Sequence, residues 1–475
     1  MKPKRQLNRV DFDSVNYDFK TKPFNHQIES IKFGCMKSKW ILGDEMGLGK
    51  TKCLIDIACI HKKYNKIQHC LIICGVNSIK YNWKAEIGIH SNESAIVIDG
   101  TLKKRLELLR NKPSEFFYII NIESLRSKEV LAELKAMVEA GFIEMIVIDE
   151  AHKCKSHTSI QGKAIHQLNS PIKIAATGTP IMNSPLDAYN ILKWLGKEKH
   201  SFYQFKNFYC IMGGFNNYQV VGYKNLDYLQ DSLQGTMLRR LKKDVLDLPD
   251  KIRQEVHVDL SPSQKRLYKE IKDELIEELD DIVLNPNPLA KLTRLRQVTS
   301  CPATLDIDYG YGAKIERMLE IIQEIIENNK KVLVFSNWSS VTEKVWEVLG
   351  AENLKFCYID GSVKDRQAQV DLFQNNDDYK ICVGTIGAMG TGLTLTAASY
   401  VIFIDSPWNM ANKEQAEDRA YRIGTKENVT IYTLVCENTI DQKIEQIINS
   451  KEMLSSALVD GNKQDLRKLV KNLLA

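Results

Sequence analysis

The sequence predicts an α/β protein built from two lobes, each a mostly parallel sheet flanked by helices, with helical inserts between them. Short apolar runs alternate with longer mixed segments in two blocks, and this alternation is typical of parallel strands connected by helices. A differently patterned stretch separates the blocks. At 475 residues, the chain is long enough to form two sizeable cores.

Each block supplies a set of expected strands. In the first block the apolar runs are 40–42, 70–74, 117–120, 145–148 and 172–175. In the second block they are 332–335, 356–359, 381–383, 400–404 and 429–435. Each run is short and apolar, as buried strands are. The two blocks share a plan, although they show no obvious sequence repeat.

The stretch between the blocks is expected to be helical. Leu267, Ile271, Leu275 and Leu279 recur every four residues among charged side chains, which predicts an amphipathic helix. The Asn-Pro-Asn-Pro sequence at 285–288 then favours a turn. We therefore expect an N-terminal arm at 1–22, a first lobe at 23–250, a helical insert at 251–312 and a second lobe at 313–475.

Composition excludes several classes of protein. No apolar segment reaches the roughly 18 residues that span a bilayer, and no apolar stretch follows the basic N-terminus, so we expect neither a membrane span nor a secretory signal. The eleven cysteines form no Cys-x-x-Cys pair, which favours a reducing compartment. His152, Cys154 and His157 crowd together, but no second ligand pair makes a metal site of them. A net charge of +5 is weak support for a polyanionic partner.

The sharpest local pattern is the sequence DEMGLGKT at 44–51. It follows an apolar run and precedes a helical pattern, which is the context of a phosphate-binding loop. Gly47 and Gly49 let backbone N–H groups approach phosphates, Lys50 would neutralise the β- and γ-phosphates, and the Thr51 hydroxyl would bind Mg²⁺. Asp44 stands where the strict pattern has its first glycine. The alternative is a glycine-rich surface turn.

Two further groups complete a site for phosphoryl transfer. Asp149 and Glu150 end an apolar strand, where one carboxylate can hold Mg²⁺ and the other can polarise the attacking water. Arg419 and Arg422 are three residues apart, which on a helix places both on one face. Such arginines stabilise negative charge on the γ-phosphoryl oxygens. By itself, this second pair would be read as an exposed basic face that pairs with neighbouring acids.

Taken together and in order, these segments resemble the SWI/SNF-type branch of the superfamily-two helicase-like ATPases, from about Phe24 to about Lys451. Asp44 at the first glycine position is what this branch has. The resemblance also rests on PFNHQ at 23–27, NW at 82–83 with Glu86, 121–125, DEAH at 149–152, TGTP at 177–180, 238–249, LRQ at 295–297 and CP at 301–302. In the second block it rests on VFS at 334–336, DGS at 360–362, GTGLTL at 390–395, 405–409, and Gln415 with the two arginines.

The resemblance implies two tandem RecA-like lobes, ATP and Mg²⁺ as cofactors, and duplex DNA as a largely sequence-independent partner. The implied catalytic residues are Lys50, Asp149, Glu150, Arg419 and Arg422, with Thr51 and Asp149 on Mg²⁺. The implied nucleotide-binding residues are Gln27, Asp44, Gly47, Leu48, Gly49, Lys50, Thr51, Gly392, Arg419 and Arg422. The residues implied to couple ATP hydrolysis to the grip on DNA are Thr177, Gly178, Thr179 and Gln415.

Candidate DNA contacts follow from the same resemblance, although packing or helix capping would explain many of them: Trp83, Asn121, Ser124, Asn337, Thr385 and Thr391. The basic cluster of Arg239, Arg240, Lys242 and Lys243 is equally compatible with DNA contact and with bracing of the lobes. Departures at Cys74-Gly75, Tyr421 and Thr425 leave ATPase activity expected and its rate open.

Two other functions share these motifs. One is a strand-separating helicase on DNA or RNA, and the other is a non-catalytic ATP-gated DNA clamp, which the presence of every expected lysine, acid and arginine disfavours. The form resembles stand-alone bacterial or viral members, so we expect a cytoplasmic protein of a bacterial or virus-infected cell. The biological task and any protein partners stay open.

Overall fold

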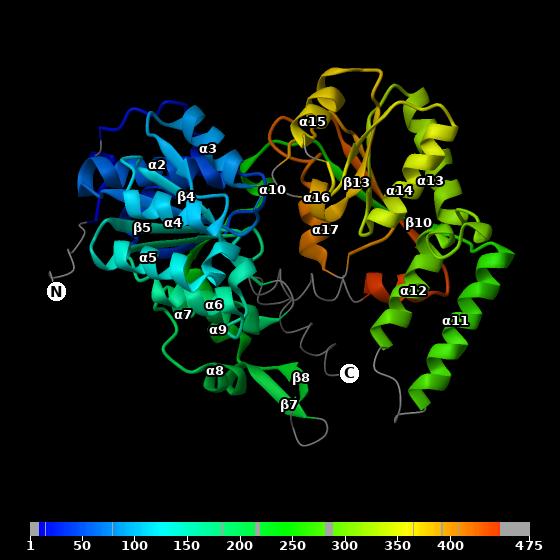
Figure 1. Ribbon diagram of the computed structural model, residues 1–475, viewed down its shortest axis with the longest axis horizontal. Coiled ribbons are helices and arrows are strands. Elements are labelled where there is room, and N and C mark those ends of the chain that lie inside the picture. The colour runs from blue at the N-terminus through cyan, green and yellow to red at the C-terminus, as the bar shows by residue number, and fades with distance from the viewer. Residues whose placement is uncertain are drawn as a thin grey trace. The chain divides into compact units, whose positions relative to one another are not determined.

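The computed structural model describes residues 9–446, apart from 15, 78, 182–183, 214–218, 281–287, 364, 391–392 and 408 (Figure 1). Its described part forms two compact units that divide between Leu246 and Asp247. Each unit has its own sheet, and every strand pair within these two sheets is parallel. None of the described helices is both long and apolar enough to cross a membrane.

The first unit contains a seven-stranded sheet in the order β3-β4-β2-β5-β6-β1-β9. Because side chains alternate along a strand, Leu71 and Ile73 of β2 enter one core while Cys70 and Ile72 enter the other. Both faces of the sheet are therefore buried, which explains why its strands read as continuous apolar runs. The strands are β1 (Lys39–Leu42), β2 (His69–Cys74), β3 (Ala95–Val97), β4 (Phe117–Asn121), β5 (Ile143–Asp149), β6 (Ile172–Ala176) and β9 (Met237–Leu238).

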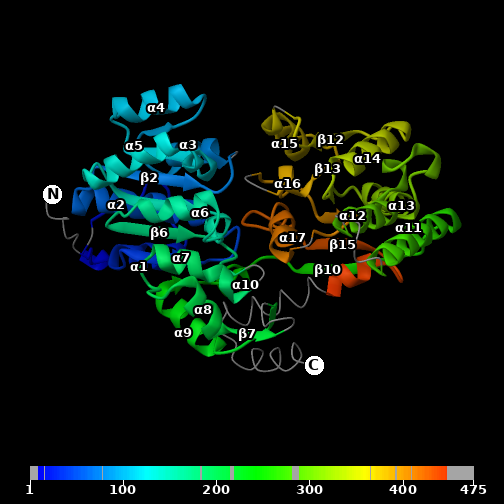
Figure 2. The same cartoon turned by 60° about the horizontal axis from the view of Figure 1, so that its bottom comes forward.

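Helices cover both faces of this sheet. Residues of α1 (Asn25–Met36), α2 (Lys50–Asn65) and α3 (Ile79–His90) build one core. The helices of the other core are α4 (Leu102–Asn111), α5 (Lys128–Glu139), α6 (Ile160–Ala164), α7 (Tyr189–Trp194), α8 (Phe202–Tyr209) and α9 (Leu226–Thr236). The short α10 (Lys242–Val245) follows, and an antiparallel pair, β7 (Cys210–Gly213) and β8 (Gln219–Tyr223), projects beside α8 (Figure 2).

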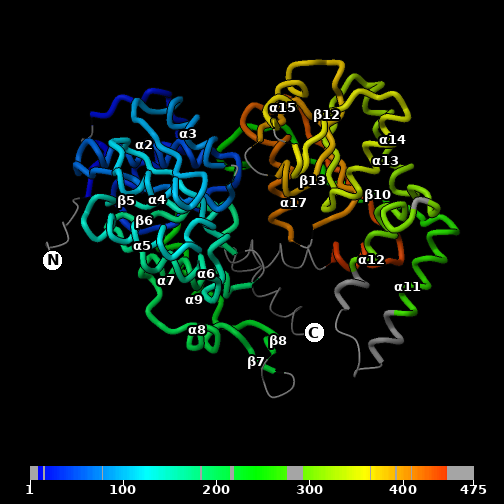
Figure 3. Tube along the Cα trace, in the orientation of Figure 1, coloured from blue at the N-terminus to red at the C-terminus, as the bar shows by residue number. Residues whose placement is uncertain are grey.

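The second unit contains a six-stranded sheet in the order β10-β15-β14-β11-β13-β12. Its strands are β10 (Lys251–Val258), β11 (Val332–Ser336), β12 (Phe356–Ile359), β13 (Ile381–Thr385), β14 (Tyr400–Phe403) and β15 (Val429–Cys436). Its helices are α11 (Pro262–Asp280), α12 (Pro288–Ser300), α13 (Ala313–Glu327), α14 (Ser339–Ala351), α15 (Arg366–Asn375), α16 (Ile386–Met389) and α17 (Met410–Glu417). The α11 and α12 helices lie side by side (Figure 3).

These elements confirm the predicted α/β fold with two mostly parallel, helix-flanked sheets. A strand is present at each of the ten predicted runs, and α11 covers the predicted amphipathic helix. Residues 285–287 of the predicted turn lie outside the described residues, and α12 begins at Pro288. The sequence did not reveal β10, which pairs with β15 from Lys251 to Val258 although most of its side chains are exposed.

Candidate active site

The phosphate-loop sequence connects β1 to α2 at the carboxyl end of a buried strand. Gly47 and Gly49 have φ angles of 81° and 78°, in the left-handed region that glycine adopts without steric cost. A Cβ on Gly49 would also lie 2.3 Å from Nε2 of Gln27. The Gln27 side-chain amide donates to the Leu48 carbonyl oxygen at 3.3 Å, so this predicted nucleotide-binding residue lies directly against the loop.

Asp44 anchors the loop from inside the first unit. Its carboxylate is 1 % exposed and pairs with Arg240, the Nη2–Oδ2 distance being 2.5 Å. The Ser30 hydroxyl donates to the same oxygen at 3.2 Å. The Arg240 carbonyl oxygen accepts from the Glu45 N–H. The acid that replaces the first glycine therefore fastens the loop to the segment after β9.

Arg239 braces the same region, because its guanidinium donates to the carbonyl oxygens of Gly43 at 2.7 Å and Gly178 at 2.9 Å. Arg239 and Arg240 thus hold the phosphate loop through contacts within the first unit. Lys50 extends along the loop, where its ammonium donates to the carbonyl oxygens of Asp44 at 2.8 Å and Glu45 at 3.2 Å.

The two predicted acids end β5, beside the loop. Both Asp149 carboxylate oxygens accept hydrogen bonds, Oδ2 from the Trp83 indole N–H at 2.8 Å and Oδ1 from the Glu150 N–H at 2.9 Å. Burial, reinforced by the Glu150 charge, raises the pKa of Asp149 to about 6, although Trp83 and the nearby Lys50 ammonium act in the opposite direction. Lys50 and Asp149 therefore share one electrostatic environment.

Glu150 has a φ of 51°, which is unusual for a residue with a side chain. Gly75 makes this conformation possible, because a Cβ there would lie 2.8 Å from the Glu150 carbonyl oxygen. The Gly75 N–H also donates to the Asp149 carbonyl oxygen at 2.9 Å. The departure from the resembled family at Cys74-Gly75 thus has a local structural reason.

His152 links the acids to the predicted coupling segment. Its Nδ1 lies 3.2 Å from Oε2 of Glu150 and 3.2 Å from Oγ1 of Thr177. Burial lowers the pKa of His152 to about 3, so the imidazole is neutral at pH 7. The Thr177 hydroxyl in turn accepts from the Thr179 N–H at 3.1 Å. The sequence had not singled out His152 as a site residue, although it belongs to the quoted DEAH segment.

Three predicted DNA contacts of the first unit are buried instead. Trp83 is 1 % exposed and bonds to Asp149, so its indole belongs to the acid site. Asn121 and Ser124 are buried and bond to each other, and Arg105 donates to the Ser124 hydroxyl at 2.8 Å. Local packing and hydrogen bonding account for the positions of all three side chains.

The predicted arginines of the second unit follow α17 and do not lie on it. The helix ends at Glu417, so the expectation of two arginines on one helical face is wrong. Arg419 is 9 % exposed and donates to the carbonyl oxygens of Gln415 and Leu393, each at 3.0 Å. Arg422 is half-buried and donates to the Thr394 hydroxyl at 2.9 Å. Both guanidiniums therefore reach the segment that begins at Leu393.

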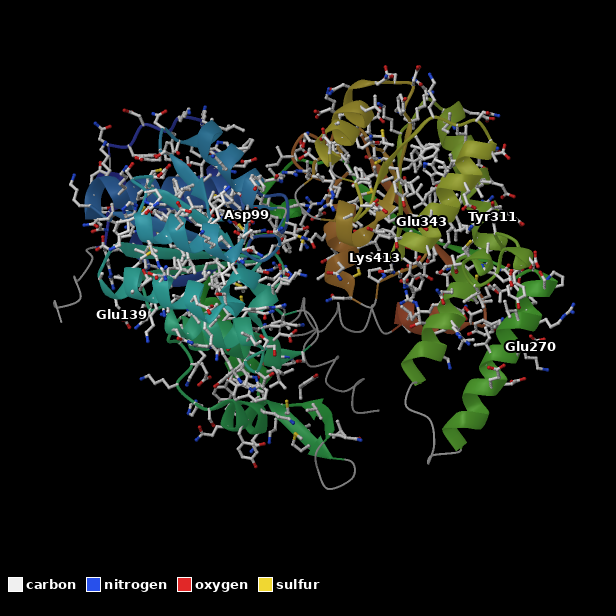
Figure 4. The ribbon with its side chains drawn as sticks, viewed as in Figure 1. Asp99, Glu139, Glu270, Tyr311, Glu343 and Lys413 are labelled. Atoms are coloured by element: carbon white, nitrogen blue, oxygen red, sulfur yellow. The ribbon has the colours of Figure 1, made fainter. Side chains whose placement is uncertain are left out.

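The other predicted residues of this unit have local partners. The Asn337 side-chain amide donates to the Asp405 carboxylate, and the Thr385 hydroxyl caps α16 by accepting from the Ala388 N–H at 3.3 Å. Gln415 is buried on α17, which the Lys413–Glu445 ion pair of 3.1 Å also holds (Figure 4 labels Lys413). Thr391 and Gly392 lie outside the described residues.

Glu417 shows why the arginine segment is not an exposed basic face. It is fully buried, and its carboxylate pairs with Lys251 at 3.1 Å and Arg253 at 2.7 Å, both on β10. Burial alone would raise the pKa of this carboxyl, but Lys251 and Arg253 lower it to about 2. The network fastens the end of α17 to the sheet and so positions the turn that carries Arg419.

This network predicts an acid-sensitive second unit. The pKa of the Glu417 carboxyl is about 2 in the folded protein and about 4.5 in the unfolded chain. Its ion pairs therefore stabilise the fold fully above pH 4.5, and this stabilisation is lost as the pH falls toward about 2. Glu417→Gln should remove about 3 kcal/mol at pH 7 and flatten the pH dependence of unfolding between these values. Urea unfolding of both proteins across this range measures the difference.

Glu427→Gln, at an exposed ion pair with Lys330, is the control. Parallel curves for wild type and Glu417→Gln would refute the assignment.

The comparisons with known proteins identify the family. The family model described as the SNF2-related domain matches residues 26–304. The chain belongs to the SNF2-related family. A second family model, the helicase conserved C-terminal domain, matches residues 313–424. The predicted SWI/SNF-type branch and the helicase-like ATPase class are thereby confirmed at the level of family.

Relatives of this SNF2-related chain include an uncharacterized ATP-dependent helicase of Mycoplasma pneumoniae, with 30 % identity over 96 % of this chain and 44 % of the relative. The ISWI chromatin-remodeling complex ATPase ISW1 of Saccharomyces cerevisiae is 28 % identical over 96 % of this chain and 43 % of its own length. The mouse DNA annealing helicase and endonuclease ZRANB3 gives the same three values. The chain thus spans less than half the length of these relatives.

A search of solved structures found the Sulfolobus solfataricus SWI2/SNF2 ATPase core in complex with dsDNA, at 26 % identity and a TM-score of 0.44. The match covers 96 % of this chain and 98 % of that chain.

Proposed function

We propose that the chain is an ATP-dependent translocase on duplex DNA that hydrolyses ATP to ADP and phosphate. The observation that carries the proposal is the continuity of contacts in the first unit from the phosphate loop to the acids and the coupling segment. Lys50 lies along the loop, Glu150 and Thr177 meet at His152, and Arg239 bonds to both Gly43 and Gly178. Chemistry at the acids is thus linked physically to the segment predicted to respond to DNA.

The residues fit a nucleotide with Mg²⁺. Two glycines in left-handed conformations open the loop, and the 16-residue α2 presents its N-terminus to it. Gly178 keeps the far side of the loop clear, because a Cβ there would lie 2.6 Å from Met46 Cγ and 3.5 Å from Lys50 Nζ. Thr51 and Asp149 would hold the ion, which when bound neutralises charge on the phosphate oxygens.

Within this proposal the side chains divide the work of hydrolysis. The Lys50 ammonium exchanges its two carbonyl partners for phosphate oxygens. Water attacks the γ-phosphorus, its proton passes to the Glu150 carboxylate, and the bond to the β-phosphate oxygen breaks. The neutral His152 ring lies between the acid and the coupling segment, with Nδ1 at 3.2 Å from both Glu150 Oε2 and Thr177 Oγ1, and so fixes the space next to the Glu150 carboxylate. Arg422 stabilises charge on the γ-phosphoryl oxygens, whereas the more deeply buried Arg419 shapes the segment around it.

The buried Trp83 is a positioning residue for Asp149 in this scheme. Trp83→Phe preserves most of the packing but removes the N–H that holds Oδ2. Loss of such a supporting partner costs about 10- to 100-fold in metal affinity, so we expect the Mg²⁺ concentration for half-maximal ATP turnover to rise by that factor. Mg²⁺ titrations of turnover and of thermal unfolding with ADP measure it.

Trp346→Phe is the matched control, because Trp346 is 54 % exposed on α14. An unchanged Mg²⁺ dependence in Trp83→Phe would show that the indole merely fills space.

Duplex DNA as the track is supported by membership of the SNF2-related family. Contacts to phosphates carry no base sequence, so movement is expected to be largely sequence-independent and binding to weaken with salt. ATP turnover is to be measured with duplex, single-stranded, forked and RNA ligands. Preferential stimulation by duplex supports the proposal, and stimulation by single strands or RNA alone contradicts it.

The alternative function, that of a strand-separating helicase, would use the same ATP site. An unwinding assay on a forked duplex separates the two functions, since a translocase consumes ATP without releasing a strand. A non-catalytic clamp is excluded by any DNA-stimulated turnover that Glu150→Gln abolishes.

A further inference from the structure

A cavity of about 410 Å³ lies in the first unit, at the amino-terminal ends of the sheet strands. The phosphate loop lies at their carboxyl ends. The cavity opens where β1 and β6 begin, with Lys39 and Ile172 among its lining residues. The phosphate loop follows Leu42 at the other end of β1, about 10 Å further along the strand. The cavity is therefore separate from the candidate active site.

The charged side chains that line this cavity are all positive. Arg9, Lys37, Lys39 and Lys197 line it, and no carboxylate is among its described lining residues. None of these four cations forms an ion pair with another described residue. Arg9 belongs to the N-terminal arm, Lys37 to the connection from α1 to β1, Lys39 to the start of β1, and Lys197 to the turn after α7.

Another cavity of the first unit gives the contrast. Its volume is about 370 Å³, and Lys20, Lys62 and Lys63 line it together with Asp18 and Glu93. Lys62 pairs with Glu93 at 2.5 Å, and Lys20 donates to the carbonyl oxygens of Gly88 and Ser91. Lys20 and Lys62 thus have carbonyl or carboxylate partners, whereas the four cations of the basic cavity form no ion pair with a described residue, and Lys37 lies 5.9 Å from the Phe33 ring centroid.

The C-terminus of α1 places partial negative charge beside the basic cavity, equivalent to about half an elementary charge against its four cations. The α1 helix ends here, and the carbonyl oxygens at a helix C-terminus repel anions. Three carbonyl oxygens of the last turn of α1 already accept a hydrogen bond: Phe33 from the Lys37 N–H, Gly34 from His61 Nε2, and Cys35 from the Val10 N–H. Burial lowers the pKa of His61, and this single N–H to Gly34 agrees with a neutral ring. The Val10 bond also fixes Arg9 at the rim.

From these observations we propose that the basic cavity is a second nucleic-acid contact, which binds phosphates of a DNA segment other than the one the motor tracks. Arg9, Lys37 and Lys197 are exposed at the rim, as side chains that meet a phosphodiester backbone are. A free nucleotide or polyphosphate is usually held by converging, enclosed donors, with an apolar or aromatic surface for a base. The described lining includes the apolar Cys35, Met36, Ile172 and Leu195, but no phenylalanine, tyrosine or tryptophan on which a base could stack.

The test uses the charge-reversed variant Lys37→Glu/Lys197→Glu in the full chain. Both positions are exposed and lie outside the ATP site, so folding and duplex-stimulated ATP turnover are expected to match wild type. Calorimetric titration at low salt with a duplex too short to reach both sites should give two binding events per wild-type chain and one per variant chain. For a longer duplex, the slope of log affinity against log salt should fall by about 0.9 for each phosphate that the variant no longer neutralises.

The matched control is Lys269→Glu/Lys272→Glu on α11, the helix that Glu270 marks in Figure 4, which changes the net charge equally. Tripolyphosphate is titrated in parallel. The proposal is overturned if wild type shows a single duplex event, if the second event survives in the variant, or if the control loses it equally. It is also overturned if the variant loses tripolyphosphate binding alone, because the ligand is then a free polyphosphate. If the wild-type chain showed no duplex-stimulated ATP turnover, the proposed function itself would be refuted.

Discussion

Glu150→Gln is expected to reduce duplex-stimulated ATP turnover by about 10²- to 10⁴-fold, the range for loss of a general base. The amide has nearly the shape of the carboxylate but cannot accept the proton of the attacking water. Nucleotide affinity should stay near that of wild type, because the loop is held by Asp44 and Arg240, which the substitution does not touch. Steady-state turnover with saturating duplex and binding of a fluorescent nucleotide measure the two quantities.

Glu139→Gln is the matched control, because this glutamate lies exposed at the end of α5, as Figure 4 shows. It should leave both quantities unchanged. If Glu150→Gln retained turnover within a few-fold of wild type, another group would have to activate the water.

Arg422→Ala should lower turnover by about 10³- to 10⁵-fold, as removal of an arginine that stabilises phosphoryl-transfer charge does. Its half-buried guanidinium carries five N–H donors in a planar fork and reaches the Thr394 hydroxyl. Arg422→Lys should recover little of the loss, because an ammonium lacks this planar arrangement of donors. Single-turnover hydrolysis separates this effect on chemistry from any effect on binding.

Arg317→Ala serves as the control for charge removal in the same unit, since Arg317 is exposed on α13 and pairs with Glu320 at 2.5 Å. Near-normal hydrolysis by Arg422→Ala would remove this arginine from the catalytic set and leave Arg419 as the candidate.

Apolar runs sufficed to predict the central strands, such as β2 and β11, because such strands are buried on both faces of the sheet. They could not predict β10, whose edge position leaves most of its side chains exposed, so that its sequence carries charge where a central strand carries valine or isoleucine. Its place is set by pairing with β15, across more than 170 residues of chain. Nor could the arginine spacing show that α17 ends at Glu417, because burial of that acid against β10 fixes the end.

In the site, local sequence order indicated the loop and the acid pair, because each follows its own strand. The supporting contacts join distant segments and have no local pattern. Arg240 reaches Asp44 across 196 positions, and Trp83 reaches Asp149 across 66. A buried acid where glycine is usual was a usable signal, since such a charge requires a cation. The indole N–H of Trp83 carries no comparable signal, so the sequence does not predict its bond to Asp149.

The most direct test of the central claim is displacement of a third strand from a DNA triplex, measured with ATP, without ATP and with Glu150→Gln. A motor that tracks along the duplex should remove the third strand only when ATP is hydrolysed, and the duplex beneath should stay paired. Release of a duplex strand would identify a strand-separating helicase instead. Purified chain that hydrolyses no ATP on any polynucleotide, or that leaves the triplex intact while consuming ATP, would contradict the account.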